Sequence, residues 1–311
     1  MPGTRACIVA LAVAAIGLAG CGGGAGGPAG SAEGITLVAT TSQLGDLARA
    51  VAGDRAEVRQ ILKANADPHA YEPRPSDVRA VAGASVVVRS GGDLDDWLAD
   101  VLRNADSGAR SVTVLDALRA RGGAGGSDPH WWQDPGNAVV AVETIRDALI
   151  AADGGGRATY TANAGRYLTR VRALDRAIAR CMARIPAARR RLVTDHDALG
   201  PYADRYAIDV VGTVIPAQSS QARASGGEVA RLVRAIRSAG VQTIFPESSL
   251  NAKLTRAIAR DAGVQVGPAL YADSLGPAGS RGETYLGSLR ANTKALVSGF
   301  TGGRERCPLP R

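Results

Sequence analysis

A long segment without proline, residues 158–185, constrains the fold of this chain more than any other feature of its sequence. Its apolar residues recur at intervals of three and four, which is the spacing of one buried face of an α-helix. They are Tyr160, Tyr167, Leu168, Val171, Leu174, Ile178 and Met182. At 1.5 Å per residue the helix is roughly 40 Å long, which is more than one lobe needs, and Pro186 ends it. The segment predicts a connector between two domains.

Segments typical of strands alternate with segments typical of helices on both sides of this connector. Strand-like segments precede it at residues 35–41, 56–62, 85–90 and 111–115, and follow it at residues 191–194, 208–214, 241–245 and 264–266. Such alternation indicates βαβ units and a mainly parallel sheet. The sequence therefore predicts an α/β fold of two βα lobes, residues 34–153 and 188–303, joined by one long rigid helix at residues 157–185.

The N-terminal residues have the pattern of a processing segment, which takes no part in the fold. The apolar stretch after Arg5 is too short to cross a bilayer as a helix. Residues 18–21, Leu-Ala-Gly-Cys, resemble a bacterial lipobox. Residues 1–20 therefore predict a lipoprotein signal peptide, Cys21 the lipidated residue, and the glycine-rich residues 21–33 a flexible tether. We expect a lipid-anchored protein on the extracytoplasmic face of the cell membrane; an ordinary secretory signal with a chance cysteine is the alternative.

The charge of the chain bears on its partners. The formal net charge is +8 at pH 7, and the basic residues are almost all arginines. A positive balance could favour an anionic membrane surface. The basic residues do not cluster with aromatic residues in the way that a nucleic-acid-binding face requires, so we expect no nucleic-acid partner and interpret the charge as a solvated surface.

Beyond the lipobox the chain has two cysteines, Cys181 and Cys307. An exported protein lies in a compartment that permits disulfides, so a bond between these two could tie the C-terminal tail to a helix. Their spacing lacks the close cysteine pairs of a zinc site. The sequence therefore suggests a possible disulfide between Cys181 and Cys307.

The three histidines of the chain, His69, His130 and His196, each follow the expected end of a strand. Histidine is the commonest protein ligand of transition metals, and open α/β sheets place ligands beyond their strand ends. His69 and His130 belong to the first lobe, whereas His196 and Asp273 belong to the second, so the four side chains can meet only in the cleft between the lobes. Three imidazoles and one carboxylate fill a tetrahedral zinc shell. The alternative to a metal site is that the three histidines are unrelated to one another and that Asp273 caps a helix or a turn.

Other residues near the histidines are candidates for supporting roles. A ligand histidine usually donates its second ring N–H to a carboxylate or a carbonyl. Glu247, at the end of an expected strand, is one such acceptor, ranked below Asp273 as a ligand. Flanking aspartates either accept from the rings or stabilise loop turns: Asp67, Asp134, Asp195 and Asp197. Trp131 and Trp132 either line the cleft or pack in the core.

Short motifs around these residues carry a family resemblance. They are Asp-Pro-His-Ala-Tyr-Glu-Pro at residues 67–73, His-Trp-Trp-Gln-Asp-Pro at 130–135, Asp-His-Asp-Ala at 195–198, and Tyr-Ala-Asp-Ser at 271–274 followed by Gly-Glu-Thr-Tyr at 282–285. Over about residues 34–303 the chain resembles the metal-binding lipoproteins of bacterial ABC importers for zinc and manganese. The resemblance implies a monomeric binding protein, not an enzyme, that captures an ion outside the cytoplasmic membrane and hands it to an ABC transporter permease. The ligands it implies are His69, His130, His196 and Asp273.

The chain departs from the pattern of the family at three places. Gln133 stands where leucine is usual, and residues 122–127 are glycine-rich where many zinc members have a histidine-rich loop. Manganese members often have glutamate at the position of His196. Because imidazole suits zinc and carboxylates suit manganese, we expect Zn²⁺ as the transported ion and regard Mn²⁺ as less favoured.

Two further functions fit the same residues. A zinc-dependent hydrolase could use Asp273 as its base over a three-histidine zinc, although four protein ligands leave no open position for the water that such an enzyme activates. An adhesin or a zinc-storage protein is the other alternative, and more than one bound metal per chain would indicate storage.

Overall fold

The computed structural model of the chain describes residues 34–122 and 128–310. The expected signal peptide, the tether and Cys21 lie outside the described residues, as do residues 123–127 of the glycine-rich loop. Among the helices of these two ranges, none combines the length and the apolar character that a membrane span needs.

The first lobe is built on a parallel sheet of four strands in the order β2-β1-β3-β4. The strands are β1 (Thr36–Ala39), β2 (Glu57–Gln60), β3 (Val86–Arg89) and β4 (Arg110–Thr113). Leu37 of the inner strand β1 pairs with Val58 of β2 on one side and with Val86 of β3 on the other. The apolar runs of β1 and β3 are buried on both faces, as expected for parallel strands that helices cover on each side.

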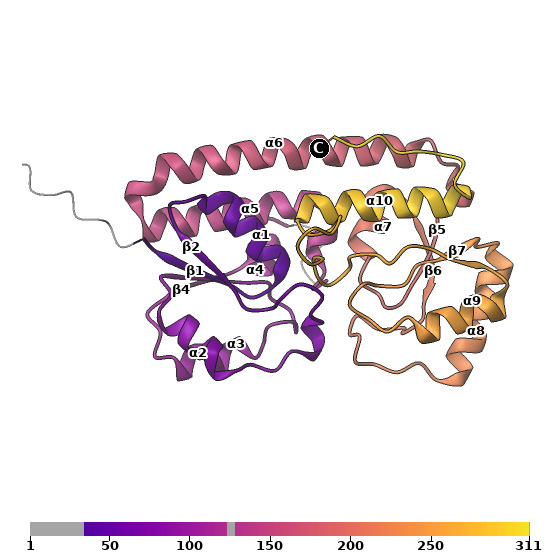
Figure 1. Cartoon of the computed structure of the whole chain (residues 1–311), viewed down its shortest axis with the longest axis horizontal. Coiled ribbons are helices and arrows are strands. Elements are labelled where there is room, and N and C mark those ends of the chain that lie inside the picture. Colours follow the sequence, from indigo (N-terminus) through magenta and orange to yellow (C-terminus); the bar gives the residue numbers. More distant parts are fainter. Residues whose placement is uncertain (1–33, 123–127, 311) are drawn as a thin grey trace, which may run out of the picture. The chain divides into compact units, whose positions relative to one another are not determined.

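Helices cover both faces of this sheet (Figure 1). α1 (Ser42–Ala52) and α5 (Pro135–Ala152) pack against Leu37 on one face. α2 (Pro75–Ala82) and α3 (Leu98–Asn104) pack against Val38 on the other face. The neighbouring side chains of Leu37 and Val38 point to opposite faces of the sheet, so β1 contributes to two apolar clusters.

One helix of the first lobe differs from the sequence-based prediction. The pattern predicts a strand over residues 111–115, but the strand ends at Thr113 and α4 (Val114–Ala120) begins at once. A short apolar run fits a buried strand as well as a buried helix. No side chain caps the start of α4, so the sequence has no capping signal that marks where the strand ends and the helix begins.

The second lobe contains two short parallel pairs of strands. β5 (Arg191–Thr194) pairs with β6 (Asp209–Thr213), and β7 (Thr243–Ile244) pairs with β8 (Gln265–Val266). A single bridge between Thr194 and Phe245 joins the two pairs. The helices of this lobe are α7 (Gly200–Tyr206), α8 (Gly226–Ala239) and α9 (Lys253–Ala262).

The connecting helix is α6 (Arg157–Ala183), and all the apolar residues that predict it are buried. α6 packs against α1 and α5 of the first lobe and against α7 and α10 of the second part of the chain, as Figure 1 shows. The prediction of an α/β fold with parallel sheets and one long helix between two lobes is confirmed. The exact limits of the lobes stay a prediction.

The last helix, α10 (Tyr285–Thr301), returns to the first lobe. The backbone N–H of Tyr285 donates to Asp46 Oδ2 of α1 at 2.9 Å, and its phenol donates to the carbonyl of Trp132 at 2.7 Å. Trp132 lies in the short helix η2 (Trp131–Gln133). Tyr285 thus joins the C-terminal part of the chain to two separate segments of the first lobe.

The C-terminal tail is fastened to α6. A disulfide joins Cys181 of α6 to Cys307 of the tail. Close to it, Arg184 donates to the carbonyl of Arg306 at 2.9 Å. Farther along, Arg290 of α10 donates to the carbonyl of Pro310 at 2.6 Å. The disulfide and these two hydrogen bonds hold the tail against both long helices (Figure 1).

Candidate metal site

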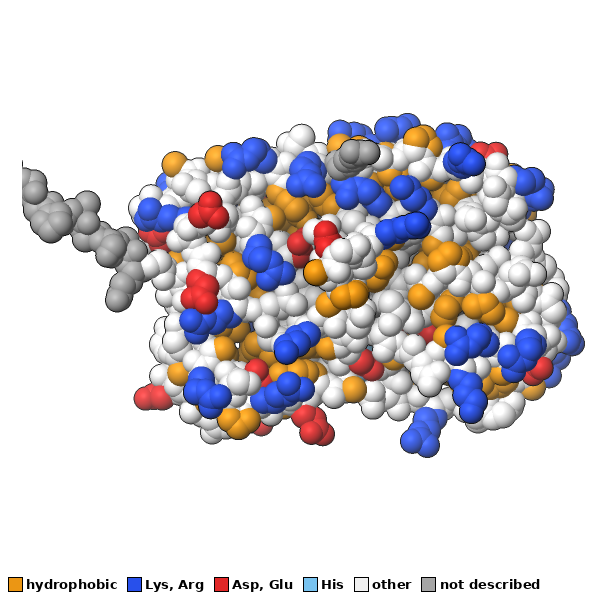
Figure 2. All heavy atoms as spheres, viewed as in Figure 1, with side chains coloured by type: hydrophobic (Ala, Val, Ile, Leu, Met, Phe, Trp, Pro, Cys, Tyr) orange, Lys and Arg blue, Asp and Glu red, His pale blue; other side chains and the backbone are white. Residues whose placement is uncertain are grey.

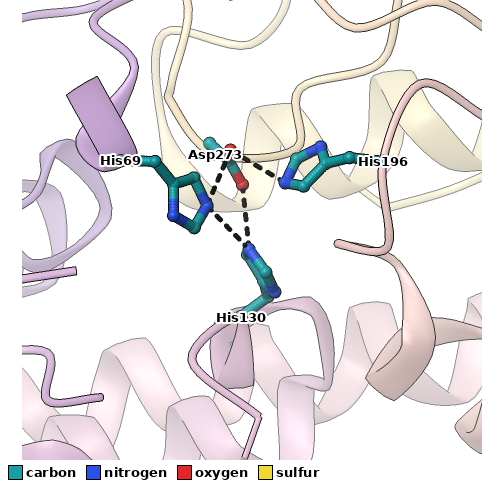
Figure 3. Close-up of side chains that lie close together, drawn as sticks. All are labelled: His69, His130, His196 and Asp273. Atoms are coloured by element: carbon teal, nitrogen blue, oxygen red, sulfur yellow. Dashed lines mark hydrogen bonds and ion pairs between the residues drawn. The ribbon is translucent and has the colours of Figure 1, made fainter. Parts of the chain in front are cut away.

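Four side chains from distant parts of the sequence converge at one point: His69, His130, His196 and Asp273 (Figure 3). His69 lies in the short helix η1 (Pro68–Ala70) after β2, and His130 directly precedes η2. His196 follows β5, and Asp273 follows the bridge between Glu247 and Leu270. The side chain of His69 is 2% exposed and the other three are fully buried. The four residues that sequence and resemblance single out are therefore brought together.

The separations between the ligand atoms have the size of a small coordination shell. Nε2 of His69 lies 3.3 Å from Nε2 of His130. Oxygens of Asp273 lie 3.5 Å, 3.4 Å and 3.2 Å from Nε2 of His69, His130 and His196. Ligands bonded to a tetrahedral zinc at about 2.0–2.1 Å lie roughly 3.3–3.4 Å from one another. One ion of that size can therefore bridge these atoms with little movement of the side chains.

Two of the imidazoles are held in one tautomer by carboxylates behind them. His130 Nδ1 lies 2.9 Å from Asp128 Oδ1, and His196 Nδ1 lies 2.7 Å from Glu247 Oε1. Because a carboxylate only accepts, each Nδ1 carries the hydrogen. The lone pair of a neutral ring is then on Nε2, which faces Asp273. This arrangement is the usual support for a histidine that binds a metal.

With neutral histidines, the centre of the cluster is rich in acceptors and poor in donors. Both oxygens of Asp273 are buried without a hydrogen-bond partner among the described residues. A buried carboxylate without partners is costly unless a cation lies against it. When both fixed imidazoles are neutral, their Nε2 lone pairs and the carboxylate of Asp273 face one point, which is the chemistry of a cation site.

The titration behaviour of the site follows from its burial and its charges. Burial lowers the pKa of His69. Burial also opposes a charge on His196, but the carboxylates of Asp273 and Glu247 outweigh it and raise the pKa of His196 to about 11. For Asp273, burial acts upward, yet the three histidines outweigh it and lower the pKa. Without a metal, His196 therefore holds a proton that balances part of the carboxylate charge.

A second layer of contacts fixes His196. Glu247 Oε1 accepts from the ring of His196 and also from its backbone N–H at 3.0 Å. Asp195 in turn accepts from the backbone N–H of Glu247 at 2.8 Å and from the hydroxyl of Thr255. Glu247 is thus the acceptor for the ring, whereas Asp195 positions Glu247.

Asp67 and Asp128 hold the backbones of the first two histidines, and Asp128 also holds the ring of His130. Asp67 Oδ1 accepts from the backbone N–H of His69 at 2.9 Å, and Asp128 Oδ1 accepts from that of His130 at 2.8 Å. Both aspartates belong to an Asp-Pro-His sequence. Sequence reasoning overlooked Asp128 as a ring acceptor, although the repeated tripeptide was a signal that could have found it.

Two of the flanking aspartates play other parts. Asp134 caps α5 by accepting from the N–H of Gly136 at 2.6 Å, and it pairs with Arg205 at 3.0 Å. Asp197 donates its backbone N–H to the carbonyl of Ala217. In the described part of the chain neither of them is hydrogen-bonded to a histidine ring, so the loop-turn interpretation holds for both.

The residues after His130 connect the site to the loop of Asp273. Trp132 Nε1 and Gln133 Nε2 both donate to the carbonyl of Ala272, each at 2.8 Å. The ring of Trp132 meets that of His130 edge-on, with centroids 5.7 Å apart. Trp131 is fully buried and donates to Ser90 Oγ at 2.8 Å. Trp132 therefore lines the site, Trp131 packs in the core, and the unusual Gln133 braces the loop from the opposite lobe.

Comparison with known proteins agrees with this geometry. The sequence pattern of the family described as zinc-uptake complex component A, periplasmic, matches residues 37–299. The manganese-binding lipoprotein MntA of Halalkalibacterium halodurans is 33% identical over 291 residues, which cover 93% of this chain and 96% of that protein. The iron-binding protein YfeA of Yersinia pestis is 30% identical over 276 residues, which cover 87% of this chain and 88% of YfeA.

Solved structures share the fold. The periplasmic zinc-binding protein TroA from Treponema pallidum superposes with a TM-score of 0.79 at 24% identity, covering 86% of this chain and 99% of TroA. A cadmium-bound periplasmic metal-binding protein from Candidatus Liberibacter asiaticus gives a TM-score of 0.76 at 23% identity, covering 86% and 99% of the two chains. At this identity the likeness concerns the fold. The family match, by contrast, excludes the hydrolase alternative: the chain belongs to the family of zinc-uptake component A proteins, which are metal-binding, substrate-binding components of ABC importers and not enzymes.

Proposed function

We propose that this protein captures one Zn²⁺ per chain through His69, His130, His196 and Asp273 and delivers it to the permease of an ABC importer. The observation that carries this proposal is the convergence of three Nε2 atoms and a bare carboxylate within one coordination shell. Three of the four donors are imidazole nitrogens. Imidazole suits zinc, whereas manganese is better held by oxygen ligands and binds most weakly in the divalent series.

The identity of the ion is the finer part of the proposal. Relatives of the chain are named for manganese and for iron, and the matching family for zinc uptake. The donor set of this chain favours zinc over manganese for the reason just given. A closed set of four protein ligands is also typical of a site that holds an ion without activating water.

The experiment that tests the ion is metal analysis of protein purified without added metal and without an affinity tag. We expect about one zinc per chain, a count that one four-ligand shell implies. Competition titrations against a chelator, with Zn²⁺ and Mn²⁺ in parallel, should give far tighter binding of zinc. Manganese in the purified protein, together with tighter binding of Mn²⁺ than of Zn²⁺ in the titration, would assign the transporter to manganese instead. Iron in the purified protein would assign it to iron.

We further propose that Cys21 carries a lipid that holds a monomeric protein at the extracytoplasmic face of the membrane. The support is the lipobox-like sequence at residues 18–21 and the glycine-rich tether behind it. Cys21→Ser should leave the protein unprocessed or shed. A variant that stays in the membrane fraction with unchanged mass would contradict lipidation at this residue.

A further inference from the structure

A hollow of about 550 Å³ lies between α1 and α6, beside the first turn of α10. The residues that matter for its chemistry are Asp46 and Arg49 of α1, Arg166, Tyr167 and Arg170 of α6, and Thr284, the N-cap of α10. None of the four residues of the candidate metal site lines it. It is a separate feature, built where three distant segments of the chain meet.

The three arginines of the hollow have neutral partners. Arg49 donates to Gln60 Oε1 at 2.7 Å, and Arg166 donates to Asn163 Oδ1. Arg170 lies over the ring of Tyr167, with its guanidinium carbon 5.9 Å from the centroid. Within residues 34–122 and 128–310 none of the three forms a salt bridge with a carboxylate. Arg49 and Arg170 act electrostatically on Asp46 without forming an ion pair with it, so the hollow holds three guanidinium charges against one carboxylate.

The one acidic side chain in the hollow is already engaged. Asp46 Oδ2 accepts from the backbone N–H of Tyr285 at 2.9 Å and from the phenol of Tyr167 at 3.4 Å. Burial raises the pKa of Asp46 above its ordinary value. A single buried carboxylate that two donors already occupy cannot balance three guanidinium groups.

The surroundings of the hollow are also positive. Arg290 of α10 is partly buried, and its burial together with the nearby charge of Arg170 lowers the pKa of Arg290. Figure 2 shows Lys and Arg side chains gathered over α6 and α10 on this face of the molecule. The start of α10 is already capped, since Tyr285 donates its backbone N–H to Asp46, so the arginines supply the charge that favours an anion.

We propose that this hollow binds a phosphate group, either free inorganic phosphate or the phosphodiester of a phospholipid headgroup. The planar fork of a guanidinium matches two oxygens of a phosphate, and such charge-assisted bonds are among the strong ones in proteins. Arg166 and Arg170 are four residues apart on α6, so they share one face of the helix, and Arg49 faces them from α1. The bound anion would link α1 of the first lobe to the connecting helix.

The test is calorimetric titration of the metal-free full chain with inorganic phosphate and, separately, with glycerophosphoglycerol, the headgroup of phosphatidylglycerol. The variant is Arg166→Ala/Arg170→Ala. The matched control is Arg172→Ala/Arg180→Ala, which removes the same charge from exposed positions of the same helix that do not line the hollow. Each variant is first checked by circular dichroism and by its unfolding midpoint in urea, which report whether the fold is intact independently of the bound metal.

We expect at least one of the two probes to bind saturably to the parent and to the control. Its binding to Arg166→Ala/Arg170→Ala should be at least about tenfold weaker, because two charge-assisted contacts are lost. The probe that binds more tightly identifies the source of the phosphate. An Arg166→Lys/Arg170→Lys variant, which keeps the charge and loses the fork, should fall between the two. Equal weakening in the control, unchanged binding in Arg166→Ala/Arg170→Ala, or no saturable binding of either probe to the parent would overturn the proposal.

Discussion

Glu247 holds His196 by two hydrogen bonds to a single carboxylate oxygen, one from the backbone N–H at 3.0 Å and one from the ring Nδ1 at 2.7 Å. The pair fixes both the place of the residue and the direction of its free ring nitrogen. A neutral amide at this position keeps an acceptor but removes the charge that makes the ring a stronger base. We expect Glu247→Gln to weaken zinc binding about tenfold, the low end of what outer partners of ligands contribute. Competition titration against a chelator measures it, with the exposed Glu305→Gln as the control that should change nothing.

Removal of a ligand itself should cost more than removal of its partner. His69→Ala, His130→Ala and His196→Ala each delete one of four donors, so each should weaken zinc binding by more than about 100-fold. Asp273→Ala should have a smaller effect because water can take the place of one oxygen ligand. The same competition titration compares all four. A histidine variant with the affinity of the parent would remove that residue from the site, and three such variants would end the proposal of a metal site here.

Zinc binding should release a proton even in mildly alkaline solution. The folded protein without metal holds a proton on His196, because the carboxylates of Asp273 and Glu247 raise its pKa to about 11. The ion must displace that proton, so the apparent affinity should rise as the pH increases toward that value. Calorimetry at pH 8 in two buffers of different ionisation enthalpy should show about one proton released per zinc. A histidine of ordinary pKa near 6.5 would be neutral at that pH and release none.

Gln133 offers a prediction that depends on one departure from the family pattern. Gln133→Leu removes the bond to the carbonyl of Ala272 and leaves only that from Trp132. We expect the free energy of unfolding to fall by about 0.5–1.5 kcal/mol, with faster release of zinc because the loop of Asp273 loses a brace. Urea unfolding and stopped-flow transfer of zinc to a chelator check the two effects. Gln265→Leu, at an exposed position of β8, serves as the control; equal release rates in the two variants would contradict the bracing role.

The disulfide should matter for stability and leave the metal site untouched. Cys181 and Cys307 are separated by 126 residues in sequence, so the bond restrains a long loop of the unfolded chain and its loss should cost about 2–4 kcal/mol. Cys307→Ser should therefore lower the unfolding midpoint while zinc affinity stays the same. Thiol titration of the denatured, unreduced parent gives an independent check, since free Cys181 and Cys307 would show that no bond forms.

The sequence predicts those parts of the molecule that depend on local patterns. The apolar spacing of residues 158–185 predicts α6, and the strand ends before His69 and His196 predict where ligands gather. Contacts between distant segments have no such local sequence pattern. The hydrogen bonds of Tyr285 to Asp46 and of Gln133 to Ala272 depend on the packing of one lobe against the other. The start of α4 at Val114 was missed because the strand before it and the helix itself share one apolar run.

Tyr285 has a consequence for how an ion enters and leaves. Its backbone anchors α10 to Asp46, while its phenol anchors the same residue to the carbonyl of Trp132, two positions from His130. A large hinge motion that moved the second lobe away from the first would break both of these hydrogen bonds. Exchange of the ion is therefore expected to proceed by short shifts of the loops that carry His69, His196 and Asp273. The speed of transfer to the permease would then depend on how easily these loops rearrange, while the frame behind them stays rigid.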